Sequence, residues 1–250
     1  MHVPGRVSLS LSGLPLRPGT AWGGTARGVL EWACSVGYRW VQIDAAMAGL
    51  RPRELDASAR REIVTMLRRR GAGISGLDLL IPSAHFADPA HADRAASAVR
   101  DAISLAGEWG DRGARLSVTI ALPAGKPGAI AADLCTHAER VGAVIADCAC
   151  PPNATPGMAV AVDPPAVLAS GTDLVASITR LASAPASARL SDLDAGGRVE
   201  AGTGRLDIGA YRVALSVVGY AGPLVADLRS LRDQEGAARR VRGLVEGTTE

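Results

Sequence analysis

Aromatic side chains and lysine are nearly missing from this sequence. Aromatic residues make up 3% of the chain, Phe86 is the single phenylalanine, and Lys126 is the single lysine among 27 basic residues. Basic and acidic residues are interspersed, and no basic stripe carries the interleaved aromatics that are typical of nucleic-acid binding. We therefore expect no nucleic-acid partner. With so few rings, Ala, Val, Leu and Ile must fill the core, as they do in barrel interiors.

Cysteine is also scarce, and long apolar runs are absent. The four cysteines at positions 34, 135, 148 and 150 do not have the spacing of a secreted disulfide framework. Cys148 and Cys150 lie close together, but two thiols alone are too few for a zinc site, so we interpret them as small buried residues. The chain does not open with a signal-peptide pattern, and no stretch reaches membrane-spanning length. We expect a cytoplasmic protein with reduced thiols and no membrane partner.

Strand and helix patterns alternate along the 250 residues, of which 48% are hydrophobic and 21% charged. Buried-strand patterns predict strands at 7–11, 40–44, 72–81, 116–122, 143–146, 158–162, 187–190 and 224–228. Helical spacing predicts helices at 25–37, 53–70, 90–109, 128–141, 173–182, 208–218 and 235–245. Eight alternating units predict a single (β/α)8 TIM barrel over residues 1–250. An open doubly wound sheet is the competing architecture, and the helix of the fifth unit is missing around 148–157.

Four motifs in the last third of the chain resemble a known family. They are MAVAVD at 158–163, RLSD at 189–192, GTGRLD at 202–207 and GYAGPLVAD at 219–227. This run resembles the closing half of the sugar phosphate isomerase/epimerase family, the xylose isomerase-like TIM barrels. In that family an Asp ends strand six, a His ends strand seven, and a Gly-x-Gly-x-x-Asp turn precedes strand eight. The positions of Asp44 and His85 agree more loosely with the N-terminal half of the family.

The resemblance implies an isomerase or epimerase that moves a proton next to a carbonyl of a small, carbohydrate-like or phosphorylated ligand at the C-terminal barrel mouth. Catalytic members of the family commonly hold a divalent metal, Mn or Mg, with Glu, Asp, His and Glu at four strand ends. The corresponding positions here are Ala121, Asp163, Arg189 and Asp227. A guanidinium cannot bind a metal. We therefore interpret Asp163 and Asp227 as an incomplete metal site and expect no cofactor.

Candidate site residues follow from the ends of the predicted strands, where barrel enzymes carry their chemistry. Asp163, Asp227 and His85 are the catalytic candidates, as bases or as general acids. Arg189, placed between Asp163 and Asp227, forms either a salt-bridge network in an old metal site or a bidentate clamp for an anion. The remaining binding candidates are Asp44, Asp192, and the backbone amides of Gly202 and Gly204, which suit a phosphate.

Two function classes remain open. The first is catalysis on a sugar-like substrate, and the second is a catalytically inactive barrel used for ligand binding or assembly. Family resemblance favours the first, whereas the substituted ligand positions favour the second. The oligomeric state is open as well.

Overall fold

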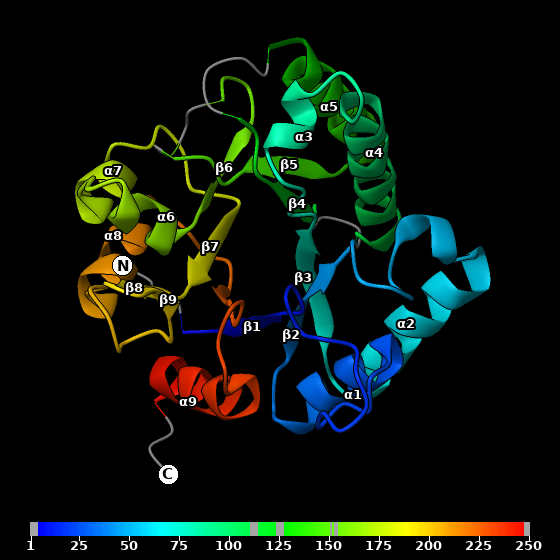
Figure 1. Cartoon of the computed structure of the whole chain (residues 1–250), viewed down its shortest axis with the longest axis horizontal. Coiled ribbons are helices and arrows are strands. Elements are labelled where there is room, and N and C mark those ends of the chain that lie inside the picture. Colours follow the sequence, from blue (N-terminus) through cyan, green and yellow to red (C-terminus); the bar gives the residue numbers. More distant parts are fainter. Residues whose placement is uncertain (1–4, 111–114, 124–127, 151, 153–154, 248–250) are drawn as a thin grey trace.

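The computed structural model describes residues 5–110, 115–123, 128–150, 152 and 155–247. Within them, eight parallel strands close into a barrel in the order β1-β10-β7-β6-β5-β4-β3-β2 (Figure 1). The barrel strands are β1 (Val7–Ser10), β2 (Trp40–Asp44), β3 (Gly73–Asp78), β4 (Ser117–Ile120), β5 (Val144–Asp147), β6 (Ala159–Val162), β7 (Ser187–Leu190) and β10 (Leu224–Ala226). The predicted TIM barrel is confirmed, and the open sheet is excluded.

Helices cover the outside of the barrel (Figure 1). They are α1 (Ala26–Ser35), η1 (Pro52–Glu54), α2 (Ala57–Arg69), α3 (Ala84–Ala87), α4 (Ala92–Trp109), α5 (Gly128–Val141), α6 (Pro164–Ala169), α7 (Leu174–Thr179), α8 (Ile208–Val217) and α9 (Gln234–Glu246). Side-chain caps fix several starts: Thr25 accepts a hydrogen bond from the amide of Gly28, and Asp56 accepts one from Ala59. No described helix combines the length and apolarity that a membrane crossing requires.

Among other boundaries, the structure differs from the prediction at the second helix and in the connection after β7. Helix α2 begins at Ala57 rather than at 53, because Pro52–Glu54 forms a 3-10 turn before the Asp56 cap. The predicted connection after β7 contains a short antiparallel hairpin, β8 (Asp192–Asp194) with β9 (Gly197–Val199). Between β5 and β6 the described residues contain no helix, as predicted, although residues 151, 153 and 154 lie outside them.

Ala, Val, Leu and Ile fill most of the core, as expected, but the inner face of the barrel carries polar side chains along β1, β2, β3 and β4. Strand neighbours in register share one face of the sheet. Ser10 pairs with Gln42, which pairs with Gly76, and Gly76 pairs with Ser117. The hydrogen bonds of Ser10 and Gln42 with Asp78 show that this face points inward. Apolar residues of the same strands, such as Val41 and Leu77, are buried on the opposite face, toward the helices. The barrel axis therefore has room and hydrogen-bond partners for a charged side chain.

Candidate functional site

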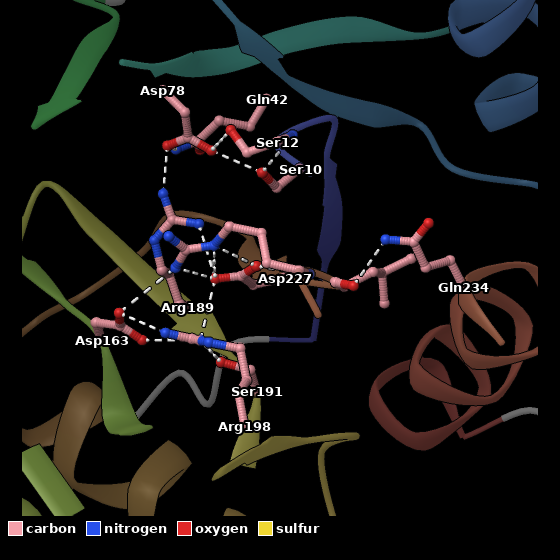
Figure 2. A network of polar contacts seen from close by, with 12 residues as sticks. Ser10, Ser12, Gln42, Asp78, Asp163, Arg189, Ser191, Arg198, Asp227 and Gln234 are labelled. Atoms are coloured by element: carbon pink, nitrogen blue, oxygen red, sulfur yellow. Dashed lines mark hydrogen bonds and ion pairs between the residues drawn. The ribbon is translucent and has the colours of Figure 1, made fainter. Parts of the chain in front are cut away.

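Arg189 lies inside the barrel with 0% of its side chain exposed. One guanidinium nitrogen donates to Asp78, and Nη1 donates to Oδ2 of Asp227 at 3.1 Å (Figure 2). Burial alone lowers the pKa of Arg189, but the carboxylates of Asp78, Asp227 and Asp163 raise it above its usual range. Arg189 is therefore a permanent cation held between carboxylates from β3 and from the end of β10.

The carboxylate of Asp78 is anchored on its other side by three polar side chains. Ser10 Oγ donates to Oδ2 at 2.6 Å and Ser12 Oγ donates to the same atom at 3.3 Å. Gln42 Nε2 donates to Oδ1 at 2.6 Å. These bonds, with the one from Arg189, account for both carboxylate oxygens (Figure 2). Asp78 is consequently locked in one orientation at the centre of the barrel.

Asp163 is paired with a guanidinium from the hairpin. Arg198, on β9, donates from Nη2 to Oδ2 of Asp163 at 2.8 Å and from Nη1 to Oδ1 at 3.1 Å. The same Nη1 donates to Ser191 at 2.5 Å and lies 3.2 Å from Asp227 (Figure 2). The hairpin thus carries Arg198 over the mouth, where 17% of its side chain is exposed.

Arg229 completes the cluster. Its Nη2 donates to Oδ2 of Asp227 at 2.6 Å and lies 3.5 Å from Asp163. The backbone turn at Gly13 (φ +79°) allows this approach, because a Cβ there would lie 2.7 Å from Cγ of Arg229. The side chain of Arg229 is 25% exposed. We call the six side chains Asp78, Asp163, Asp227, Arg189, Arg198 and Arg229 the mouth cluster; its formal charges cancel.

The sequence matches no protein-family model and no curated protein. Solved structures do match. A xylose isomerase-like TIM barrel protein from Mycobacterium smegmatis, in complex with magnesium, has a TM-score of 0.68 at 15% identity over 97% of this chain and 95% of that one. The IOLI protein with a bound zinc atom has a TM-score of 0.70 at 14% identity, with the same coverage. D-psicose 3-epimerase from Clostridium cellulolyticum H10, with D-tagatose, has a TM-score of 0.67 at 11% identity over 96% of both chains.

This chain has the xylose isomerase-like TIM barrel fold.

The donor set at the mouth of this xylose isomerase-like barrel does not fit a divalent metal. Asp163 and Asp227 face each other as predicted, but every oxygen of both carboxylates accepts a hydrogen bond from an arginine or a backbone amide. The described residues contain no group of three or more His, Cys, Asp or Glu side chains in a metal-binding arrangement. A hard cation requires more oxygen ligands than this, and the guanidinium groups repel it.

The sequence placed Arg189 between Asp163 and Asp227, where it could pair with either carboxylate. Arg189 does bind Asp227, but its second partner is Asp78 rather than Asp163. Asp163 is bound instead by Arg198 and Arg229. Asp78, Arg198 and Arg229 were not predicted as site residues. Asp78 is the last residue of β3, so a search for charged residues at strand ends would have found it only with the correct end of this strand.

Asp44 lies on the inner face beside the mouth cluster, at the end of β2. It is half-buried and accepts a hydrogen bond from the amide of Ala46 at 2.8 Å. Burial raises the pKa of Asp44, and the neighbouring charge of Asp78 raises it further. Asp44 thus forms no ion pair with the arginines of the mouth cluster, and its pKa is raised. A raised pKa is typical of a carboxyl group that can exchange a proton.

The amides of Gly202 and Gly204 do not face a ligand, which corrects the prediction of a phosphate site. Both donate to Oδ2 of Asp192, at 3.1 and 2.9 Å, while Leu193 and Leu206 donate their amides to Oδ1. The carboxylate of Asp192 fills the place that a phosphate was expected to take. Asp192 is fully buried, and both oxygens of its carboxylate hold the turn that follows the hairpin.

Gly204→Ala is expected to lower the free energy of unfolding by about 1–3 kcal/mol, the usual cost of overpacking. A Cβ at this position would lie 2.5 Å from the carbonyl oxygen of Leu193 and 2.6 Å from Oδ1 of Asp192. Equilibrium unfolding in urea measures the change. Gly209→Ala in α8 is the control and should be neutral or stabilising, since alanine favours helix. Equal stability of the two variants would show that Asp192 does not organise this turn.

His85 does not join the mouth cluster. It lies in a cleft lined by residues that follow β2 and β3 and by the start of α4, and no residue of the mouth cluster is part of that lining. Its ring stacks on His91, with centroids 4.9 Å apart. Cys148 is half-buried, and its partial burial raises the pKa of its thiol to about 12, which makes it a poor nucleophile at neutral pH. Neither His85 nor Cys148 forms a hydrogen bond with Asp163 or Asp227 in the described residues.

Proposed function

We propose that this protein is a metal-independent xylose isomerase-like barrel that binds a small, sugar-like ligand bearing an anionic group at its C-terminal mouth. The observation that carries the proposal is the pairing of Asp78, Asp163 and Asp227 with three arginines where the metal site of the family would lie. In this view the metal site is degenerate, and Arg189 supplies the positive charge. Arg198 and Arg229 retain partly exposed guanidinium groups, which suit a carboxylate or phosphate of the ligand.

Sugar-like ligands are proposed because D-psicose 3-epimerase, which has the same fold, was solved with D-tagatose. In this proposal the hydroxyl groups of the ligand lie beside the half-buried carboxyl group of Asp44, and its charged end meets the two arginines. The interior position of Arg189 closes the bottom of this site. Ligand recognition therefore rests on hydrogen bonds and charge, with no metal step.

Titration calorimetry with gluconate, compared with neutral glucose, tests the proposal. Binding of gluconate should be saturable and unchanged by EDTA or by added manganese. Arg198→Gln and Arg229→Gln should each weaken it by about tenfold or more, the effect of one lost charge-assisted hydrogen bond. Arg61→Ala, which removes an exposed cation from α2, is the control. Binding that requires manganese, or that is lost equally in Arg61→Ala, would overturn the proposal.

A catalytic role is the second candidate, and the raised pKa of Asp44 favours it. A carboxyl group with a raised pKa beside two guanidinium groups is suited to remove a proton next to a carbonyl, while the arginines stabilise the developing negative charge. Exchange of substrate C–H hydrogen for deuterium, followed by NMR on sugar acids without metal, measures this activity. Exchange that is retained in Asp44→Asn would contradict the role of Asp44.

A further inference from the structure

A cleft of about 370 Å3 opens at the N-terminal end of the barrel strands. Its walls include the first residues of β2 and β3, Trp40 and Gly73, and Leu116, which directly precedes β4. The last turns of α2 and α4 complete them. The carboxylates of the mouth cluster lie at the opposite ends of the strands. The volume is in the range of small-molecule clefts, about 300–1,000 Å3, so the cleft is a candidate site separate from the mouth.

The walls of this cleft are apolar and partly open to solvent. The indole rings of Trp40 and Trp109 line it together with Val64, Leu67 and Ile74. Trp40, Val64 and Ile74 are only half-buried, so part of this surface contacts water. Removing apolar surface from water favours binding. A flat apolar body in the cleft therefore covers surface that the fold itself leaves open.

Two glycines set the shape of the cleft. A Cβ on Gly73 would lie 3.0 Å from Cζ3 of Trp40. A Cβ on Gly71, where φ is +67°, would lie 3.0 Å from Nη1 of Arg39. Larger residues at these two positions would push the indole and the guanidinium out of place. Glycine thus allows Trp40 to form a wall of the cleft and Arg39 to form its rim.

The charge in the lining is positive. Arg39 and Arg68 line the cleft, and the lining includes no carboxylate among the described residues. Arg39 is exposed, and its Nη1 donates to the carbonyl oxygen of Arg70 at 3.1 Å. This bond holds the guanidinium at the rim, whereas Nε and Nη2 form no hydrogen bond within the described part of the chain. Two donors on one edge of a planar guanidinium match the two oxygens of a carboxylate.

We propose that this cleft binds a small aromatic carboxylate. The ring system lies against Trp40 and the aliphatic side chains of α2 and β3, and the carboxylate accepts hydrogen bonds from Nε and Nη2 of Arg39. A polyhydroxylated ligand does not suit this lining, because its polar side-chain groups are only the indole N–H groups and the two guanidinium groups. The inference does not rest on the proposed function, since the cleft and the mouth cluster share no residue.

Calorimetric titration with 2-naphthoate, the neutral 2-naphthalenemethanol and acetate tests the proposal. 2-Naphthoate should bind saturably, the alcohol about tenfold more weakly, and acetate least. Arg39→Gln should weaken 2-naphthoate by about tenfold, the effect of one lost charge-assisted hydrogen bond, and leave the alcohol unchanged. Val64→Phe, which places a ring in the cleft, should abolish the binding of both. Arg61→Gln is the control, since it removes an exposed cation of α2 that lies outside the lining.

NMR signals of the indole N–H groups locate the ligand. 2-Naphthoate should shift the signals of Trp40 and Trp109. It should leave those of Trp22 and Trp32 in place, because these two rings pack on each other with centroids 4.6 Å apart and do not line the cleft. Circular dichroism checks that the variants fold. Arg39 is exposed, so Arg39→Gln keeps the test decisive if Val64→Phe does not fold.

Several outcomes would overturn the proposal. One is equal binding of 2-naphthoate and its neutral alcohol, and another is binding that leaves the Trp40 and Trp109 signals unshifted. Binding that is lost in Arg198→Gln and kept in Arg39→Gln would place the carboxylate at the mouth instead. A protein that sediments as a dimer and becomes monomeric with 2-naphthoate would show that a second copy of the chain occupies the cleft.

Discussion

Arg189→Ala is expected to lower the free energy of unfolding by about 3–5 kcal/mol at neutral pH. Deleting one partner of a buried ion pair has this effect because it leaves charges without compensation, here those of Asp78 and Asp227. Equilibrium unfolding in urea measures the loss. Arg100→Ala is the matched control, since Arg100 forms an exposed pair with Asp133 at 2.7 Å, and such pairs contribute about 0–1 kcal/mol. A wild-type midpoint for Arg189→Ala would contradict the prediction.

The same variant should be less impaired in mild acid. Burial raises the pKa of Asp227, but Arg189, followed by Arg229 and Arg198, lowers it well below its usual range. In the wild type the carboxylate of Asp227 therefore stabilises the folded state fully at pH values above the pKa of about 3.9 that it has in the unfolded chain. This stabilisation is lost as the pH falls through the lower pKa that Asp227 has in the folded protein. Without Arg189, one carboxylate takes up a proton at higher pH. The difference between the variant and the wild type should accordingly shrink from pH 7 to about pH 5.

Asp227→Ala is the second variant with a large expected effect, again about 3–5 kcal/mol at neutral pH. Asp227 contacts Arg189, Arg198 and Arg229, so its loss leaves three guanidinium groups with two carboxylates. The variant also opens a space the size of a carboxylate. Added formate should fill it and raise the midpoint of unfolding by mass action.

Two controls separate this effect from general salt stabilisation. For the wild type, formate should raise the midpoint of unfolding no more than chloride does at the same ionic strength. It should also not raise the midpoint of Asp133→Ala, a variant that lacks an exposed carboxylate. Equal stabilisation of all three proteins by formate would show that Asp227 does not hold the arginines together.

The sequence predicts the barrel well, because its strands are short buried runs and its helices carry regular apolar spacing. It also predicts that Asp163, Arg189 and Asp227 meet, because each ends or follows a buried strand, and parallel strand ends gather at one face. The boundaries of β2, α5 and β7 agree with the prediction to the residue.

The rest of the mouth cluster depends on information that sequence patterns do not carry. The third strand was predicted to end at residue 81, whereas β3 ends at Asp78. Asp78 was therefore not considered as a strand-end residue. The hairpin that carries Arg198 contains Asp and Gly residues typical of a loop, and its pairing is fixed by long-range contacts. The second partner of Arg189 was not predicted, because the sequence pattern does not show that the Ser10 and Gln42 side chains orient Asp78 inside the barrel.

We propose that the guanidinium of Arg189 takes the place of a metal ion among the carboxylates at the mouth. Elemental analysis tests it most directly, on the full-length protein incubated with excess manganese or zinc and then desalted. We expect far less than one ion per chain, because the carboxylates are already paired with arginine. A tightly held ion in a ratio of about one per chain, as a complete oxygen-ligand site would give, would contradict it.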